Sequence, residues 1–99
     1  PSIIKSGDLR ISISTGGSSP ALAKNIRKSL QNQFGPEYAD LTELLSRMRQ
    51  LALSSIKDEK VRKSVLTGFA DNKYLEMIKL KGKDFVENEM RNIITNMAK

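Results

Sequence analysis

The residues best suited to chemistry lie in one short loop and on the helix predicted to follow it. Residues 15–20 have the sequence TGGSSP, which combines two glycines, three hydroxyls and a proline. A hydroxyl residue before a proline is typical of a helix N-cap, and the free N–H groups and dipole at a helix start favour an anion. The candidate binding residues are Thr15, Gly16, Gly17, Ser18, Ser19, Pro20, Lys24, Arg27 and Lys28.

The three cations of this set follow the loop on the polar side of the predicted helix. Residues 18–34 contain three basic and no acidic side chains, so this face would attract a polyanion such as nucleic acid or a substrate with several carboxylates. A capped turn without a ligand, followed by a solvated helix face, explains the same residues. The motifs of a P-loop and of a nucleophile elbow are both absent, so nucleotide and ester hydrolysis are unsupported.

Composition excludes several classes of protein. The 99 residues can form one compact domain or two very small ones, and 17 basic against 11 acidic residues give a net charge of +6. The absence of cysteine and histidine removes disulfides, the usual nucleophile–base pairs and nearly every zinc site, so we predict no catalytic residue and no metal ligand. The longest apolar runs are triplets, which predicts no membrane contact. Because the chain starts with Pro1, we expect a piece of a longer protein.

The N-terminal segment has the pattern of a β-hairpin. Residues 9–14 alternate apolar and polar side chains, a short β-branched run at residues 2–4 precedes them, and Gly7-Asp8 favours a turn between the two. Two strands alone are marginally stable and expose two edges of unpaired backbone groups. We therefore expect strands from elsewhere to complete this sheet.

Helical periodicity occupies the rest of the chain. We predict helices over residues 20–34, from Pro36 onward, after a cap at Asp58, around Tyr74 as a short segment, and after a cap at Asp84. The fold class is therefore α+β, with a hairpin-plus-helix subdomain at 1–35 and an all-helical subdomain at 36–99. The predicted core stripes include four aromatic residues and, by default, all four methionines. The aromatic positions are Tyr38, Phe69, Tyr74 and Phe85.

The first 30 residues resemble the sirohaem synthase family. The likeness rests on PSII at residues 1–4, on ISISTGGSSPALA at 11–23 and on the continuation through Ile26-Arg27 to Leu30. Members of that family include precorrin-2 dehydrogenases, some of which are combined with sirohydrochlorin ferrochelatase activity. The resemblance implies a dimerisation domain followed by a helical domain, as in the middle of a sirohaem synthase. It places the NAD-binding Rossmann domain and the catalytic aspartate upstream of Pro1, so NAD would be bound by that part of the parent protein.

The resemblance also implies a binding role for the loop. Thr15, Ser18 and Pro20 match loop positions that contact the tetrapyrrole substrate in the family, and Gly16, Gly17 and Ser19 match positions that shape the loop. The three helix cations are added on charge alone, because precorrin-2 and sirohydrochlorin carry eight carboxylates. Family members exchange this region between subunits, which implies a homodimer through strand 9–14 and helix 20–34.

These observations lead to one main hypothesis and two alternatives. The main hypothesis is the dimerisation and helical portion of a cytoplasmic precorrin-2 dehydrogenase in sirohaem and porphyrin biosynthesis, inactive when isolated. The first alternative is a small basic helical module that binds nucleic acid, although five aromatic residues with none forming a visible stacking platform argue against it. The second is a protein-interaction domain in which the loop is only a helix cap. Whether the parent protein also inserts iron is left open.

Overall fold

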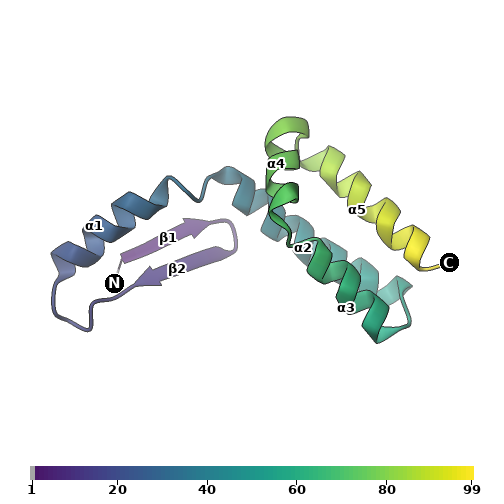
Figure 1. The fold of residues 1–99 in the computed structure, drawn as a ribbon, viewed down its shortest axis with the longest axis horizontal. Coiled ribbons are helices and arrows are strands. Elements are labelled where there is room, and N and C mark those ends of the chain that lie inside the picture. Colours follow the sequence, from purple (N-terminus) through teal and green to yellow (C-terminus); the bar gives the residue numbers. More distant parts are fainter. Residues whose placement is uncertain (1) are drawn as a thin grey trace.

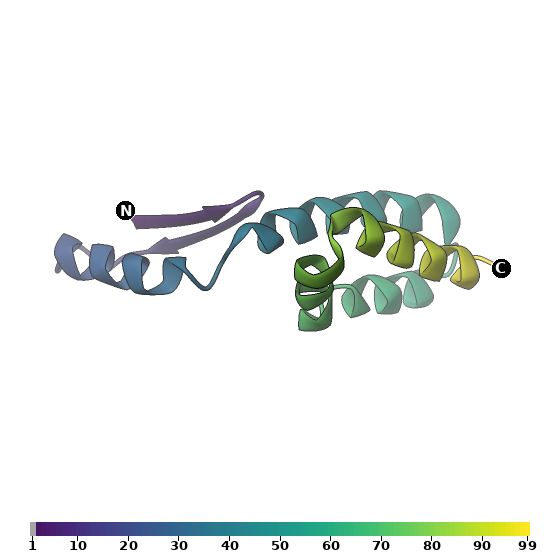
Figure 2. The ribbon, with the colours of Figure 1, turned by 90° about the horizontal axis from the view of Figure 1, so that it is seen from above.

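The molecule is elongated and joins a β-hairpin at one end to a helical bundle at the other. The computed structural model describes residues 2–99, which extend over 54 × 29 × 16 Å (Figures 1 and 2). The elements in this range are β1 (Ser2–Ser6), β2 (Leu9–Ile13), α1 (Pro20–Gln31), α2 (Pro36–Ser55), α3 (Glu59–Gly68), α4 (Asn72–Lys81) and α5 (Lys83–Met97). The predicted α+β class is confirmed.

Strands β1 and β2 form an antiparallel hairpin with a two-residue turn. Ile4 pairs with Ile11 and is almost completely buried, and β1 contacts both α1 and α2. Gly7 begins the turn with a φ of 61°, which favours glycine at the first position of a tight hairpin turn. A Cβ at Gly7 would lie 2.7 Å from the Cα of Ala39, so the turn contacts the start of α2 very closely. The Ser6 hydroxyl donates to the Gly35 carbonyl at 2.7 Å and fixes the same junction.

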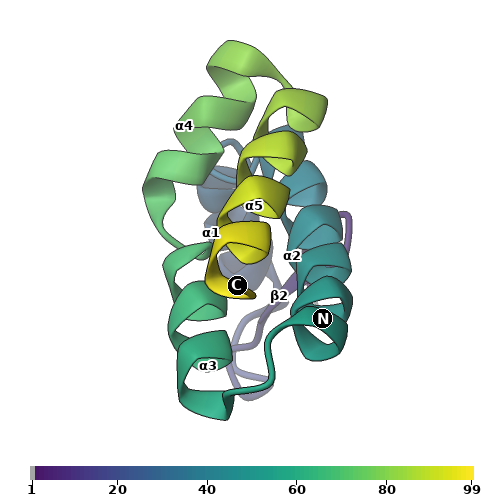
Figure 3. The ribbon, with the colours of Figure 1, turned by 90° about the vertical axis from the view of Figure 1, so that its right-hand side faces the viewer.

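The main core lies among α2, α3, α4 and α5. Figure 3 shows α5 between α2 on one side and α3 and α4 on the other. The rings of Phe69 and Tyr74 pack edge to face at 5.7 Å, and Phe69 is almost completely buried. The core residues of this bundle are Leu41, Leu44, Met48, Ala52, Ile56, Phe69, Tyr74, Leu75, Ile78, Val86, Met90 and Ile94.

Two predicted element ends differ from the structure. Strand β2 ends at Ile13 and not at residue 14, and α1 ends at Gln31 and not at residue 34. The N–H groups of Gln33 and Phe34 donate to carbonyls three residues earlier, which is a tighter turn than an α-helix. Pro36 then disfavours helical backbone at Gly35, so the chain extends before α2 begins.

Three predictions on α5 were wrong. Gly82 and not Asp84 is the N-cap, because the positive φ of 90° at Gly82 turns the chain directly from α4 into α5. Phe85 is 43% exposed and Met97 is 52% exposed, so neither belongs to the core. Met90 is buried as predicted, and Val86 and Ile94 complete the buried stripe. A spacing of three or four residues is compatible with burial of either of two neighbouring faces of α5. Packing against α2 and α4 determines which of these faces is buried.

Candidate anion-binding site

The loop between β2 and α1 is closed by its own hydroxyl groups. The Thr15 hydroxyl donates to the Ser19 carbonyl at 3.0 Å and its oxygen accepts from the Ser19 N–H at 2.9 Å. The Ser18 N–H donates to the Thr15 carbonyl at 3.1 Å. Thr15 therefore holds the two ends of the loop together, which is a structural role distinct from contacting a ligand.

The two loop glycines are required by backbone conformation. Gly16 and Gly17 have φ values of 64° and 84°, which side chains rarely allow. A Cβ at either position would meet no atom within 4 Å, so the surface beside the loop is open. The glycine pair therefore gives a tight turn and leaves room for a ligand to approach the backbone.

Ser19 is the N-cap of α1, and Pro20 is the first helical residue. The Ser19 oxygen accepts from the Leu22 N–H at 3.1 Å. Among residues 2–99, no acceptor is bonded to the N–H groups of Gly17 and Ala21, and the Ser18 hydroxyl has no hydrogen-bond partner. These three donors next to a helix start are the groups that an anion could use.

Two hollows border the first turn of α1, and Pro20 and Ala23 line both. One hollow of about 270 Å³ is lined further by Ile13, Ser14, Thr15 and Gly17. The other, of about 430 Å³, is lined further by Ser2, Ile3, Lys24 and Arg27. The structure thus places the loop and the two cations on either side of one helix turn. Gly16, Ser18, Ser19 and Lys28 line neither hollow.

Sequence patterns did not identify β1 as part of this site. Ser2 and Ile3 line the same hollow as Lys24 and Arg27. The apolar side chain of Ile3 is 41% exposed. The only sequence signal was the β-branched run at residues 2–4, which predicts a strand and gives no neighbour in space. Leu22 and Ile26 of α1 are also exposed, at 51% and 37%. The hairpin and α1 therefore present apolar surface that the described residues do not cover.

The cations of α1 carry a positive charge that nearby residues do not neutralise. Within the described range, Lys24, Arg27 and Lys28 form no ion pair, and α1 contains no acidic residue. Arg27 donates to the Gln31 side-chain oxygen at 2.6 Å, which holds the guanidinium along the helix. This positive charge would attract an anionic ligand to this end of the molecule.

In the helical bundle, by contrast, acidic and basic side chains form ion pairs with each other. Arg47 pairs with Glu87 at 2.7 Å and with Glu43 at 3.3 Å, and Arg91 pairs with Glu87 at 2.8 Å. Hydrogen bonds from Arg91, together with the charge of Arg47, hold the pKa of Glu87 below its usual value. A hydrogen bond from Lys83 lowers the pKa of Glu43 in the same way. Both carboxylates are held in ion pairs that link α2 to α5. Glu43 and Glu87 therefore do not form a general acid–base pair for catalysis.

Neither a metal site nor a membrane segment is found in the part of the chain that the structure describes. Residues 2–99 hold no group of three or more metal-ligating side chains, and none of their helices has the length and apolar character to cross a membrane.

Comparison with known proteins points to one family. Residues 6–33 match the family model described as sirohaem biosynthesis protein, central, and this range holds β2, the loop and α1. A precorrin-2 dehydrogenase of Methanosarcina barkeri is 41% identical over 66 residues, which cover 67% of this chain and 30% of that protein. A siroheme synthase of Neisseria meningitidis serogroup C is 24% identical over 90 residues, which cover 91% of this chain and 19% of that protein.

The solved structures include a relative of the same kind. The chain of SirC, a precorrin-2 dehydrogenase, superposes with a TM-score of 0.77 and 25% identity, covering 93% of this chain and 45% of that one. The chain therefore spans less than half of the relatives that it matches. The resemblance stated for the first 30 residues is confirmed, and the chain is similar to the precorrin-2 dehydrogenases and siroheme synthases.

Proposed function

We propose that this chain is the dimerisation and helical portion of a precorrin-2 dehydrogenase, which oxidises precorrin-2 to sirohydrochlorin with NAD. The observation that carries the proposal is the coincidence of two independent features. The family model matches residues 6–33, and the same residues hold the unpaired donors and cations of the candidate anion-binding site. The boundary between the two parts would lie at Gly35, giving subdomains 1–35 and 36–99.

The substrate side of this proposal rests on charge. Precorrin-2 and sirohydrochlorin are polycarboxylates, so a rim of cations and free N–H groups would bind their side chains. Lys24 and Arg27 would each contact a carboxylate from the hollow beside β1, and the Gly17 N–H would contact another from the hollow beside the loop. The Ser18 hydroxyl lies outside both hollows and would contact a carboxylate at the exposed side of the loop. Lys28 would add longer-range attraction, and Thr15, Gly16, Ser19 and Pro20 would hold the loop in shape.

The described residues do not fit a dinucleotide. A Rossmann site needs a parallel sheet with a glycine-rich turn that leads from a strand into a helix. Residues 2–99 offer an antiparallel hairpin, and the Gly16-Gly17 turn is closed by Thr15 and Ser19. NAD would therefore be bound by another part of the parent protein, and this chain alone would be inactive.

Homodimerisation is proposed from the uncovered surface of the N-terminal end. Within residues 2–99 the sheet has two strands and hence two unpaired edges, which are a template for further pairing. Ile3 on β1, together with Leu22 and Ile26 on α1, adds exposed apolar area. The expected interface at strand 9–14 and helix 20–34 thus corresponds to β2 and α1. A cytoplasmic location is part of the same proposal, as the compartment in which sirohaem would be made.

Activity of the parent protein is the direct test. The whole protein should convert precorrin-2 to sirohydrochlorin only when NAD is added, and residues 1–99 alone should not. Oxidation of a different class of substrate, with no turnover of precorrin-2, would refute the proposal.

The contribution of the loop to ligand binding can be measured separately from its contribution to folding stability. Ser18→Ala removes a hydroxyl that has no partner within the described residues, whereas a change at Thr15 would also open the loop. If Ser18 contacts the substrate, Ser18→Ala should weaken tetrapyrrole binding and leave the unfolding free energy unchanged. Unchanged binding would favour a loop that serves only as a helix cap.

The dimer is tested by sedimentation equilibrium. Leu22→Glu puts a charge on the exposed apolar face of α1 and should shift the protein toward monomer. Leu53→Glu is a matched control, because Leu53 on α2 has nearly the same exposure of 49% but lies away from the hairpin. A monomeric wild type, or equal effects of the two variants, would contradict the proposed interface.

A further inference from the structure

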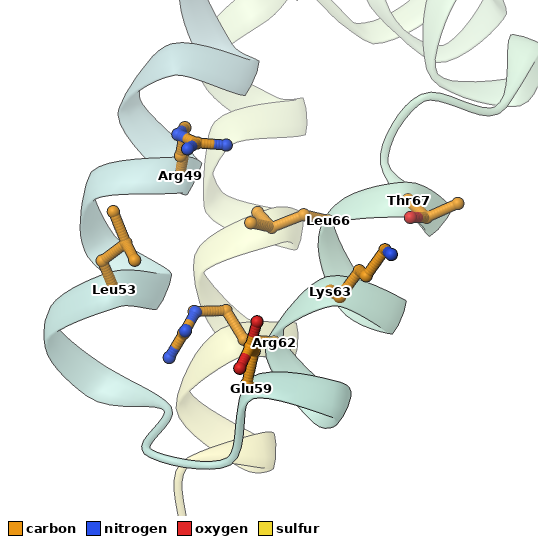
Figure 4. A pocket seen from close by; sticks show the side chains of 7 residues that line it. All are labelled: Arg49, Leu53, Glu59, Arg62, Lys63, Leu66 and Thr67. Carbon is orange, nitrogen blue, oxygen red and sulfur yellow. The ribbon is translucent and has the colours of Figure 1, made fainter.

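The helical bundle has a groove that the proposed function does not use. It lies between α2 and α3, has a volume of about 500 Å³, and is drawn in Figure 4. Its lining residues are Arg49, Leu53, Glu59, Arg62, Lys63, Leu66 and Thr67. The α3 members recur at intervals of three and four residues, and Arg49 and Leu53 are four apart, so each helix contributes one stripe. The groove therefore extends about 12 Å along α3, or two helical turns, and about 6 Å along α2, or one turn.

The middle of the groove is apolar. Leu53 projects from α2 and is 49% exposed, and Leu66 projects from α3 and is half-buried. In Figure 4 the two leucine side chains lie on opposite walls, with α5 behind both helices. Helices α2 and α3 form two sides of the groove, and α5 closes a third side. The fourth side is open. An apolar side chain seated between the two leucines would be removed from water.

The rim of the groove carries positive charge with no partner. Within residues 2–99, Arg49, Arg62 and Lys63 form no ion pair, although Arg47, only two residues from Arg49, pairs with both Glu43 and Glu87. The Arg62 guanidinium donates to the Ile56 carbonyl at 2.9 Å, which fixes its position. Three cations therefore flank two leucines, and the groove itself supplies one carboxylate, that of Glu59.

We propose that this groove docks an acidic amphipathic helix of a partner protein. One apolar side chain of the helix would lie between Leu53 and Leu66, and acidic residues one turn away on either side would reach Arg49 and Lys63. A basic residue of the partner would face Glu59. This proposal does not depend on the proposed enzymatic function.

Charge alone would also allow a nucleic acid, but the lining favours a helix. Single strands bind through cations and stacked aromatic rings, and the groove has no aromatic residue among those that line it. Glu59 would repel phosphates, and the two leucines have no polar group that could bind them. A peptide helix satisfies the leucines, the cations and the carboxylate together.

Binding is tested with a defined probe. The probe is an 18-residue fluorescein-labelled peptide with leucines at helical spacing, glutamates beside them and one lysine, and its control is the same composition in scrambled order. Fluorescence anisotropy with the full protein should show at least tenfold tighter binding of the ordered peptide. The double variant Arg49→Glu/Lys63→Glu should weaken this binding at least tenfold, as should Leu53→Asn on the apolar side.

A matched control isolates the groove from general charge. Lys57→Glu/Lys60→Glu makes the same change of charge beside the groove, at residues that do not line it, and should change the affinity less than threefold. Equal weakening by the two double variants would overturn the proposal, as would equal binding of the ordered and scrambled peptides. Tighter binding of a single-stranded oligonucleotide than of the ordered peptide, lost in Arg49→Glu/Lys63→Glu, would instead assign the groove to nucleic acid. No peptide binding up to millimolar concentration would also refute it.

Discussion

Replacing Gly7 by alanine should separate the hairpin from the helical bundle. Gly7 has a φ of 61°, and an added Cβ would lie 2.7 Å from the Cα and 2.8 Å from the Cβ of Ala39. Real Cβ atoms do not approach backbone so closely, so either the turn or the start of α2 must move. The Ser6 hydrogen bond to Gly35 spans the same junction and would be strained by that movement.

The cost has two parts that can be estimated. Left-handed backbone at a residue with a Cβ costs about 1–2 kcal/mol, and overpacking at a tight contact costs about 1–3 kcal/mol more. Gly7→Ala should therefore lower the unfolding free energy by about 2–5 kcal/mol. Gly16→Ala is the matched control, because Gly16 has a φ of 64° and open space around it. It should cost only the backbone part.

Urea unfolding followed by circular dichroism measures both variants against the wild type. Gly7→Ala should be less stable than Gly16→Ala by about 1–3 kcal/mol. A difference below about 0.5 kcal/mol, which is the range of an ordinary surface substitution, would show that the hairpin turn does not pack against Ala39 as described.

Three further predictions concern stability. Phe69→Ala should lower the unfolding free energy by about 3–5 kcal/mol in urea, because the ring is buried in the bundle core, and a loss below 1 kcal/mol would contradict that burial. Ser19→Ala should cost about 1 kcal/mol in the same assay through loss of the N-cap, whereas Ser18→Ala should cost far less, and equal costs would contradict the cap. The pKa of Glu87 is lowered by folding, so its stabilisation is present above the usual value of 4.5 and is lost as pH falls through the lower folded value. Glu87→Gln should therefore flatten the decline of stability in acid, and parallel pH profiles would contradict this.

Much of the fold was predictable because local signals and packing agree. The alternation at residues 9–14, the Gly7-Asp8 turn and the Ser19-Pro20 helix start each correspond to an observed element. The cap at Asp58 is confirmed as well, since its carboxylate accepts from the N–H groups of Lys60 and Val61. These features depend on residues close in sequence, which is why a sequence pattern identifies them.

The errors arise where tertiary contacts decide between equal local choices. Asp84 is a good capping residue, but the chain turns at Gly82 and α5 starts earlier than the cap signal indicates. Phe85 is apolar, yet the buried face of α5 passes through Val86, and the Phe85 ring lies at the surface with the Lys81 ammonium 5.9 Å from its centroid. Helical spacing alone does not determine which side of a helix meets its neighbours.

The sequence suggested candidate residues for the site, but it indicated neither their geometry nor the contribution of Ser2 and Ile3. Sequence patterns identified the loop and the cations as one set, whereas the structure places Thr15 and Gly17 in one hollow and Lys24 and Arg27 in another. The second hollow depends on β1 lying beside α1, a contact between residues about twenty apart in the sequence. Nothing in local spacing predicts that contact.

The most direct test of the central claim is the affinity of the parent protein for sirohydrochlorin, measured by absorbance titration. Lys24→Ala/Arg27→Ala removes the two cations of the hollow beside β1, and losing two charge-assisted contacts should weaken binding at least about tenfold. Lys57→Ala/Lys60→Ala removes the same charge from α3 and its N-terminal end, and should leave the affinity within twofold. If both double variants bind as the wild type does, or if the wild type does not bind the tetrapyrrole, the site assigned to α1 and its loop is wrong.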